Sequence, residues 1–203
     1  YGVRYTWVDS KLSKAVGVKN GYAPGTKYNN APDDKVGQVG SDKNSRPVFN
    51  LSLNWTGLPD TSLRAGWSQG FRVPNLQEKY LINNMGGGTI YGNSSLKPEK
   101  SNNFEVGARY AGRAVEADFA LFYNLADDYI STEHFNSREY RYVNADKAKT
   151  FGAELSVNFK PTDHFFPYAS MTWLRRKTEW GNGVSTYDSG VAGFTARYGV
   201  KTE

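Results

Sequence analysis

Apolar and polar residues alternate with a period of two along much of the chain. From Leu63 to Phe71 every second residue is mostly apolar: Leu63, Ala65, Trp67, Gln69 and Phe71. The residues beside them are polar or small: Ser62, Arg64, Gly66, Ser68, Gly70 and Arg72. Successive side chains of a strand point to opposite faces, so this pattern predicts a strand with one apolar and one polar face. Proline cannot donate a ladder hydrogen bond, so we expect Pro74 to end the strand.

The same alternation predicts three hairpins. The paired segments are 48–55 with 61–72, 103–110 with 115–124, and 150–159 with 165–177. Turn residues such as Pro59 and Asp60 join the partners over a short distance. In the last segment Pro167 interrupts the alternation, so the sequence leaves the faces of that strand open. Alternation at both ends of the chain, in 2–9 and 195–203, predicts further strands, and we expect the chain to be a piece of a longer protein.

Long polar stretches separate the hairpins. They cover residues 19–47, 75–100, 128–141 and 177–189. Short turns at one end of the strands and long loops at the other are typical of outer-membrane barrels, whereas a soluble sandwich has moderate loops at both ends. The polar face also carries mid-strand charges, which a closed soluble core would not tolerate, although the solvent-facing side of an open sheet would: Arg64, Glu105, Arg109, Glu116, Asp118 and Glu154. Aromatic residues near the segment ends fit interfacial girdles, and ordinary strand residues are the alternative: Tyr5, Trp7, Trp55, Tyr110, Tyr123 and Trp173.

Composition narrows the alternatives. The chain has 203 residues, of which 38% are hydrophobic, and no run approaches the roughly 18 apolar residues of a membrane helix. These values fit either a soluble β protein or a membrane β-barrel. Cysteine is absent, which excludes disulfides, thiolate metal sites and cysteine nucleophiles. The net charge of +5 is scattered among 20 acidic residues rather than gathered in a stripe, so we expect no nucleic-acid partner.

Catalytic and metal-binding patterns are missing from the sequence. The two histidines, His134 and His164, fall in different predicted loops without metal-ligand spacing. Asp127 and Asp128 are adjacent, which suits turn chemistry rather than a shared proton. Gly86 to Gly88 lack the setting of a phosphate-binding loop and instead allow the chain to bend. We therefore expect no enzyme, no catalytic residue, no metal site and no cofactor.

A basic run and three loop tyrosines are the candidates for ligand binding. Arg175, Arg176 and Lys177 follow one another at the end of a predicted strand. They suit an anionic iron chelate or the phosphates of lipopolysaccharide, and a solvated strand end is the alternative. Stacked aromatic rings and cations suit a flat or anionic chelate. The predicted ligand-binding residues are Tyr80, Tyr91, Arg175, Arg176 and Tyr187.

Three motifs carry a resemblance to a known family. They are "FRVP" in the segment 70–80, "NSSLKPEKS" in 93–101, and "NADKAKTFGAE" in 144–154. In this order they resemble the FRxP-like, N-x-x-L-x-P-E-x-S and N-x-x-x-A-x-x-x-G-x-E elements of TonB-dependent outer-membrane receptors. The resemblance runs from about Pro47 to the end, and the first segment shares only the strand pattern. Family members have a plug domain and a TonB-contacting box before a barrel of about 22 strands, and neither segment is recognisable here.

The resemblance implies an all-β fold: residues 1–203 would be a partial, antiparallel transmembrane β-barrel domain with short periplasmic turns and long extracellular loops, part of a larger barrel. It implies an outer-membrane receptor of a Gram-negative bacterium that takes up an iron chelate, contacts outer-membrane lipid and is energised by TonB in the full-length protein. The alternatives are a passive barrel or a non-transporting β-rich binding module. Haem recognition usually needs an axial ligand such as His, and 75–93 contains none, which favours a ferric siderophore over haem.

The motifs also predict a structural lining of the barrel lumen. An unpaired charge facing the lumen would be costly unless it met water or an opposite charge. We expect the lining to include Arg72, Pro74, Glu99, Arg109 and Glu154.

Overall fold

The described part of the chain is a sheet of long strands with one short helix. The computed structural model describes residues 1–12, 40–85, 88–188 and 192–202. The elements are β1 (Gly2–Leu12), β2 (Gly40–Leu58), β3 (Thr61–Arg72), α1 (Leu76–Tyr80), β4 (Ile82–Met85), β5 (Gly88–Tyr91), β6 (Glu99–Ala111), β7 (Val115–Asn136), β8 (Glu139–Phe159), β9 (Phe165–Glu179), β10 (Ser185–Tyr187) and β11 (Phe194–Thr202).

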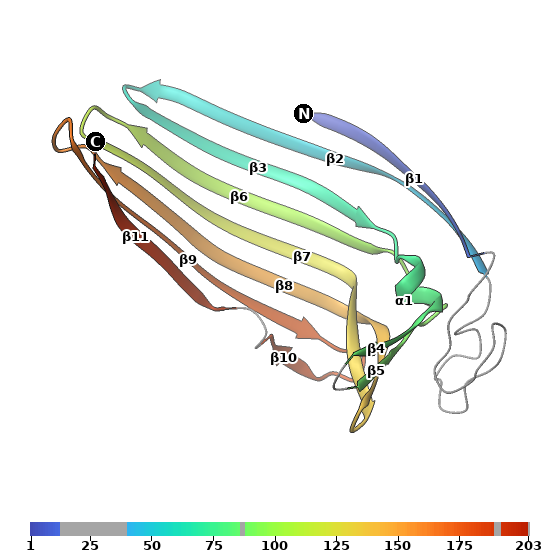
Figure 1. Ribbon diagram of the computed structural model, residues 1–203. Helices are drawn as coiled ribbons and strands as arrows, with labels where there is room; N and C mark the ends of the chain where they lie inside the picture. Colours follow the sequence, from blue (N-terminus) through green and yellow to red (C-terminus); the bar gives the residue numbers. More distant parts are fainter. Residues whose placement is uncertain (13–39, 86–87, 189–191, 203) are drawn as a thin grey trace.

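The long strands lie side by side in the order β1-β2-β3-β6-β7-β8-β9-β11, and each pairs antiparallel with its neighbours (Figure 1). The three predicted hairpins are confirmed as β2–β3, β6–β7 and β8–β9. The strands predicted at the two ends of the chain are confirmed as β1 and β11. Among the described residues, no second sheet covers either face of this one, which contradicts a soluble sandwich.

One face of the sheet is continuously apolar, and we call it the apolar face. The strand register joins one row of apolar residues across six strands: Trp55, Leu63, Ala108, Phe119, Leu155 and Met171. Most of the large side chains of this row are exposed: 43% of the surface of Leu63 and 41% of that of Phe119 is accessible to solvent. The faces of β9, which the sequence left open, follow from the pairing of Met171 with Leu155 and of Trp173 with Ala153.

The apolar band is displaced along the strands from one margin of the sheet to the other. The row that contains Leu51 and Trp67 continues through Phe104, Tyr123 and Phe151 and reaches Arg175 in β9. Leu51 is inside the apolar run of β2, but Arg175 lies beyond that of β9. This displacement is expected for strands that are tilted from the normal of a bilayer, as the strands of a closed barrel are tilted from its axis.

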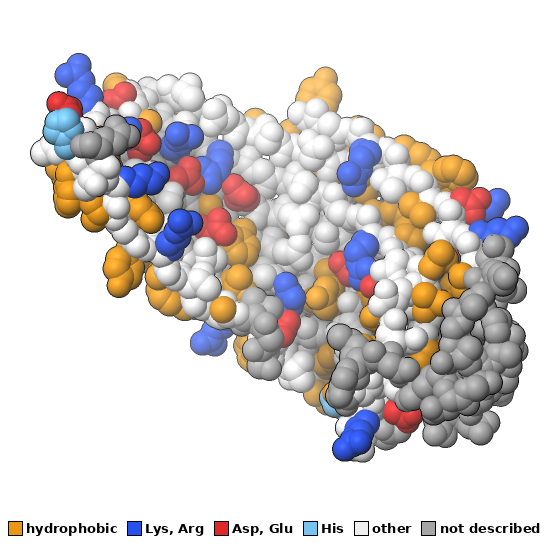
Figure 2. Space-filling view, in the orientation of Figure 1, with side chains coloured by type: hydrophobic (Ala, Val, Ile, Leu, Met, Phe, Trp, Pro, Cys, Tyr) orange, Lys and Arg blue, Asp and Glu red, His pale blue; other side chains and the backbone are white. Residues whose placement is uncertain are grey.

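The opposite face, which we call the polar face, carries the charged residues predicted to face the lumen. Arg64, Glu105 and Asp118 all lie on it, between apolar-face neighbours in the sequence. In the view of Figure 2, acidic and basic side chains lie next to one another near the end with the short turns, and apolar side chains show mainly along the margins. Opposite charges side by side reduce the cost of charge on a barrel wall.

The prediction of a loop at 128–141 is wrong. Strand β7 continues to Asn136 and β8 begins at Glu139, so the two form a long hairpin that extends beyond the apolar band. No alternation marks this extension, because a strand beyond the apolar band needs no apolar face.

The other predicted long loops also contain secondary structure. Segment 75–100 includes α1, the hairpin β4–β5 and the start of β6, and β5 pairs in parallel with β8. Segment 177–189 includes the end of β9 and β10, which returns along it. Residues 40–47 of the first predicted loop belong to β2, while 19–39, Gly86, Gly87 and Ser189 lie outside the described residues. None of the helices in the described ranges has the length and apolar character to cross a bilayer.

Candidate functional site

An arginine crosses three strands of the polar face. The guanidinium of Arg64 on β3 donates from Nε to Glu105 on β6 at 2.9 Å, and from Nη1 and Nη2 to both oxygens of Asp118 on β7 at 3.0 and 2.8 Å. Gly107 leaves room for it, since a Cβ there would lie 2.7 Å from Arg64 Cζ. The paired, fork-like geometry fixes the side chain although about a third of it is exposed. It ties β3 to β7 across the intervening strand.

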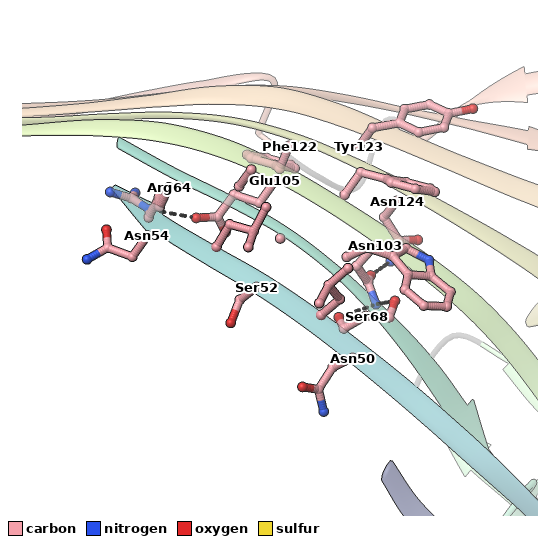
Figure 3. Close-up of a pocket in the computed structure, with 16 residues that line it drawn as sticks. Asn50, Ser52, Asn54, Arg64, Ser68, Asn103, Glu105, Phe122, Tyr123 and Asn124 are labelled. Carbon is pink, nitrogen blue, oxygen red and sulfur yellow. Dashed lines mark hydrogen bonds and ion pairs between the residues drawn. The ribbon is translucent and has the colours of Figure 1, made fainter. Parts of the chain in front are cut away.

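A hollow of about 610 Å³ lies beside this arginine. Figure 3 shows Arg64 and Glu105 on one side of it, with Ser68, Asn103 and Asn124 further along. Asn124 donates to Asn103, which donates in turn to the Ser68 carbonyl at 3.3 Å. Amide and hydroxyl groups both donate and accept hydrogen bonds, so this wall can meet water or a polar solute.

The three motifs of the sequence meet in one cluster at the end of the sheet where the long loops are. Arg72 of the first motif donates to Glu78 at 2.9 and 3.1 Å and contacts Glu99 of the second motif at 3.4 Å. Glu99 also accepts from the backbone N–H of Ile130 at 3.2 Å. Glu78 completes a capping box with Asn75 at the start of α1. One arginine therefore joins the end of β3, the helix and the start of β6.

The second and third motifs are joined directly. Asn144 of the third motif accepts from the Lys97 N–H at 2.8 Å and donates to the carbonyls of Lys97 and Asp128 at 3.0 and 2.7 Å. Asn93 of the second motif donates to the Tyr142 carbonyl at 2.9 Å. These bonds anchor the loop after β5 to the extension of β8.

A small core supports this cluster, which we call the motif cluster. Pro74 is fully buried, and Leu96, Ile130 and Ala145 are buried with it. Pro74 thus ends β3 as predicted and also fills space under the loop. Burial and the charge of Glu78 raise the pKa of the nearby Tyr142 hydroxyl, which therefore stays neutral at physiological pH.

A buried lysine holds the helix against β2. Lys79 is 5% exposed, and its Nζ donates to Asp42 at 2.9 Å and to the Leu96 carbonyl at 3.3 Å. Burial alone would raise the pKa of the Asp42 carboxyl, but hydrogen bonds from Lys79 and Asn44 outweigh it and hold this pKa below its usual value. Asp42 lies outside the apolar band, on the part of β2 beyond Pro47.

Replacing Asp42 with Asn should lower the melting temperature of the full-length protein, because it leaves Lys79 buried without its counter-charge. We expect a loss of about 1–3 kcal/mol at neutral pH. Since the folded pKa of Asp42 is depressed, the ion pair stabilises above about pH 4 and its contribution is lost as the pH falls through the folded pKa. Melting curves of the two proteins should therefore differ at pH 7 and converge as the pH falls through the folded pKa of Asp42; a difference that persists in acid would contradict this.

The five predicted ligand-binding residues do not form one site. Tyr80 and Tyr91 are 5% and 4% exposed and belong to the loop after β3; Tyr91 donates to Glu139 at 2.8 Å. Arg176 lies on the polar face, where it contacts Thr150 at 3.1 Å. Arg175 lies on the apolar face, in the row of Phe151, with the ring of Tyr187 6.0 Å from its Cζ. The strand alternation thus separates the two adjacent arginines.

Arg176 has further polar neighbours at the long-loop end. Its Nη1 lies 3.3 Å from the Tyr129 hydroxyl and 3.3 Å from Asp188 Oδ2. The pairing of β7 with β8 omits Asp128, whose φ of 53° lies in the left-handed region that Asp tolerates. This irregularity turns Tyr129 toward Arg176 on the polar face. The expected turn chemistry at Asp127 and Asp128 is therefore an irregular point within a strand.

The remaining predicted residues lie apart. Arg109 and Glu154 are both exposed on the polar face, opposite Asp118 and Ala120 respectively. His134 lies in β7 rather than in a loop, with its ring centroid 4.0 Å from that of Tyr140, and His164 lies in the turn before β9. Within the described ranges, no group of His, Cys, Asp and Glu could hold a metal ion.

Several residues that hold the loop in place are not among the residues predicted from the sequence. Glu78 and Asn75 could have been found, because N-x-x-E before a helical segment is a capping-box pattern. Asn93 and Asn144 stand in the quoted motifs, but the motifs alone do not predict their hydrogen bonds. The pair of Lys79 and Asp42 spans 37 residues and carries no local signal.

The sequence matches a family model described as TonB dependent receptor-like, beta-barrel, over residues 1–201. The match thus includes the first segment, which had shown only a strand pattern. The chain is 31% identical over 150 residues to the iron-regulated outer membrane virulence protein of Vibrio cholerae serotype O1, a match that covers 66% of this chain and 22% of that protein.

Solved structures show the same fold. The copper transporter OprC has a TM-score of 0.72 and 20% identity over 99% of this chain and 29% of its own. The siderophore receptor PirA from Pseudomonas aeruginosa has a TM-score of 0.59 and 19% identity over 79% of this chain and 37% of its own. The chain therefore spans between about a fifth and two fifths of the length of these proteins.

Its relatives are outer-membrane proteins of Gram-negative bacteria. The apolar face is thus the lipid-facing side and the polar face the lumen side of a wall segment, and the chain belongs to the TonB-dependent receptor family, within its β-barrel domain.

Proposed function

We propose that the full-length receptor takes up a ferric siderophore across the outer membrane and is energised by TonB. The observation that carries the proposal is the division of the sheet into a lipid-facing apolar face and a polar face with a docked loop at its long-loop end. Such a wall can border an aqueous path for a polar solute. The names of an iron-regulated protein and of a siderophore receptor among the similar proteins support the choice of ligand.

Within this chain, Arg176 is the residue that we propose to meet the ligand. It lies on the polar face at the long-loop end, and about 29% of its side chain is exposed. A guanidinium pairs well with the carboxylate and catecholate-type oxygens of an anionic chelate. Tyr80 and Tyr91 are buried, so their proposed role is to shape the loop that surrounds the ligand rather than to stack on it.

Growth of the source bacterium tests the ligand class. The full-length receptor would be present or deleted, with single siderophores, haem or simple ferric salts as the iron source. We expect loss of growth on one siderophore, and loss of the same growth when TonB is removed. If deletion of the receptor stopped growth on haem alone, and His134→Ala also stopped that growth, the choice of a siderophore would be overturned. Growth under copper limitation is a further arm of the experiment, because the copper transporter OprC has this fold.

Replacing Arg176 with Ala should weaken binding of that siderophore about tenfold, because a charge-assisted hydrogen bond is lost. Arg175→Ala is the matched control, since it removes the same charge one residue away on the lipid-facing side. Binding to the purified full-length variants would be measured by titration. Equal losses in both variants, or none in either, would contradict the assignment of Arg176.

A further inference from the structure

The basic run at the end of β9 is divided between the two faces of the sheet. Arg176 lies on the polar face, whereas Arg175 and Lys177 lie on the apolar face. Lys177 is paired in register with Tyr187 of β10, whose ring lies beside Arg175. Two of the three cations therefore point toward the surroundings of the barrel and away from its lumen.

Neighbouring strands place more cations beside these two on the apolar face. Lys149 and Lys147 of β8 lie in register with Lys177 and Glu179 of β9, and Lys100 of β6 lies opposite Asp127 of β7. We call Lys100, Lys147, Lys149, Arg175 and Lys177 the cationic belt. Across these rows of the described sheet the five cations face two carboxylates, Asp127 and Glu179.

The carboxylates leave the belt with excess positive charge. Lys149 and Lys177 lie 2.7 and 3.5 Å from the same oxygen of Glu179, so one carboxylate serves two ammonium groups. Arg175 and Lys147 are exposed. A surface of this kind attracts anions with several oxygen acceptors, of which phosphate is the usual one.

The belt borders the apolar band directly. Tyr123 and Phe151 lie one row from Lys149 toward the short turns, and Trp173 lies one row from Arg175. Phe151 and Trp173 pack edge to face with centroids 5.5 Å apart and remain 38% and 41% exposed. A lipid whose acyl chains cover these exposed rings would have its head group next to the cations. A soluble anion would meet the charges but leave the rings uncovered.

We propose that the cationic belt binds the phosphate groups of a phosphorylated glycolipid in the outer leaflet, of the lipid A type, while the acyl chains of that lipid cover the adjoining rings. The site is at the long-loop end, which faces the cell exterior, and on the lipid side of the wall. It is separate from the polar face on which the transported ligand is proposed to bind.

Purified full-length receptor, stripped of native lipid in neutral detergent, provides the test. The probe is diphosphorylated lipid A in mixed micelles, compared with the same lipid after dephosphorylation and with inorganic phosphate in excess as competitor. The variant Arg175→Gln/Lys177→Gln removes two charges from the belt. The matched variant Arg109→Gln/Arg176→Gln removes two from the polar face. Gel electrophoresis of unheated samples is the control for folding: each variant must migrate as the folded wild-type protein does.

We expect the belt variant to bind diphosphorylated lipid about thirtyfold more weakly and the matched variant to bind it nearly as the wild type does. Glu179→Gln should strengthen binding, because it removes the shared carboxylate. Equal weakening in both double variants, unchanged binding in the belt variant, equal binding of the dephosphorylated lipid, or displacement of the lipid by inorganic phosphate would each overturn the proposal.

A measurement on the wild type keeps the proposal testable if the belt variant does not fold. Amine-reactive labelling of Lys149 and Lys177 should be suppressed by the diphosphorylated lipid and not by the dephosphorylated one. Labelling of Lys160, at the short-turn end, should be the same with both lipids. Unprotected Lys149 and Lys177 in the presence of diphosphorylated lipid would overturn the proposal.

Discussion

Replacing Leu155 with Arg should lower the free energy of unfolding of the full-length receptor in lipid by about 2–4 kcal/mol. Leu155 lies near the centre of the apolar run of β8, between Phe119 and Met171. An arginine there would place its guanidinium in hydrocarbon, far from both interfaces. Ser156→Arg should change the free energy by about 0.5 kcal/mol or less, because Ser156 faces the lumen side opposite Asp118.

Both variants would be unfolded and refolded in phospholipid vesicles over a range of denaturant, with tryptophan fluorescence and heat-dependent gel mobility as the two readouts. The pair is matched in depth, side chain and strand, so only the direction of the side chain differs. Equal destabilisation by the two substitutions, or a greater loss for Ser156→Arg, would show that the faces are assigned the wrong way round.

Replacing Arg72 with Ala should cost about 2–3 kcal/mol and reduce assembly of the receptor. Glu78 and Glu99 have side chains only 11% and 17% exposed, and both would lose their counter-charge. Removing one partner of a fully buried pair costs about 3–5 kcal/mol, and the 44% exposure of Arg72 places this case lower. The motif cluster would loosen where β3, α1 and β6 meet.

Arg109→Ala is the control, because Arg109 is also an arginine on the polar face but is exposed. The temperature at which folded gel mobility is lost should fall for Arg72→Ala and stay near the wild-type value for Arg109→Ala. Affinity of the assembled fraction for the proposed siderophore should be nearly unchanged in both. Normal assembly of Arg72→Ala with selective loss of ligand binding would instead place Arg72 in the binding site.

Much of the transmembrane wall can be predicted from the sequence, because a bilayer imposes a strict period on each strand. The alternation in 61–72 or 150–159 directly records which side chains meet lipid. Proline at position 74 and the short turn at Pro59 and Asp60 mark strand ends through local backbone chemistry.

The long-loop end is harder to predict because lipid no longer constrains it. Residues 128–136 lack a regular alternation of apolar and polar residues, and their strand is held by pairing with β8 rather than by an apolar pattern. The basic run was predicted to bind the ligand as a whole, but Arg175 and Arg176 lie on opposite faces of the sheet. Their composition does not show which side chain points to which face, because this depends on whether the strand continues through the run. The hydrogen bonds between Arg72 and Glu99 and between Asn144 and Lys97 join segments that are distant in the sequence. The structural role of these motif residues is therefore seen only in the three-dimensional structure.

The central claim is that alternate residues of these strands face lipid and the lumen of a receptor barrel. This chain contains no cysteine of its own, so cysteines can be placed one at a time from 150 to 159 along β8, and labelling is compared with that of the receptor without the added cysteine. In the full-length receptor in membranes, a lipid-soluble thiol reagent should label positions 151, 153, 155 and 157, and a membrane-impermeant one should label 152, 154, 156 and 158 when the lumen is open to water. Labelling without this period of two, or with the two sets exchanged, would contradict the account.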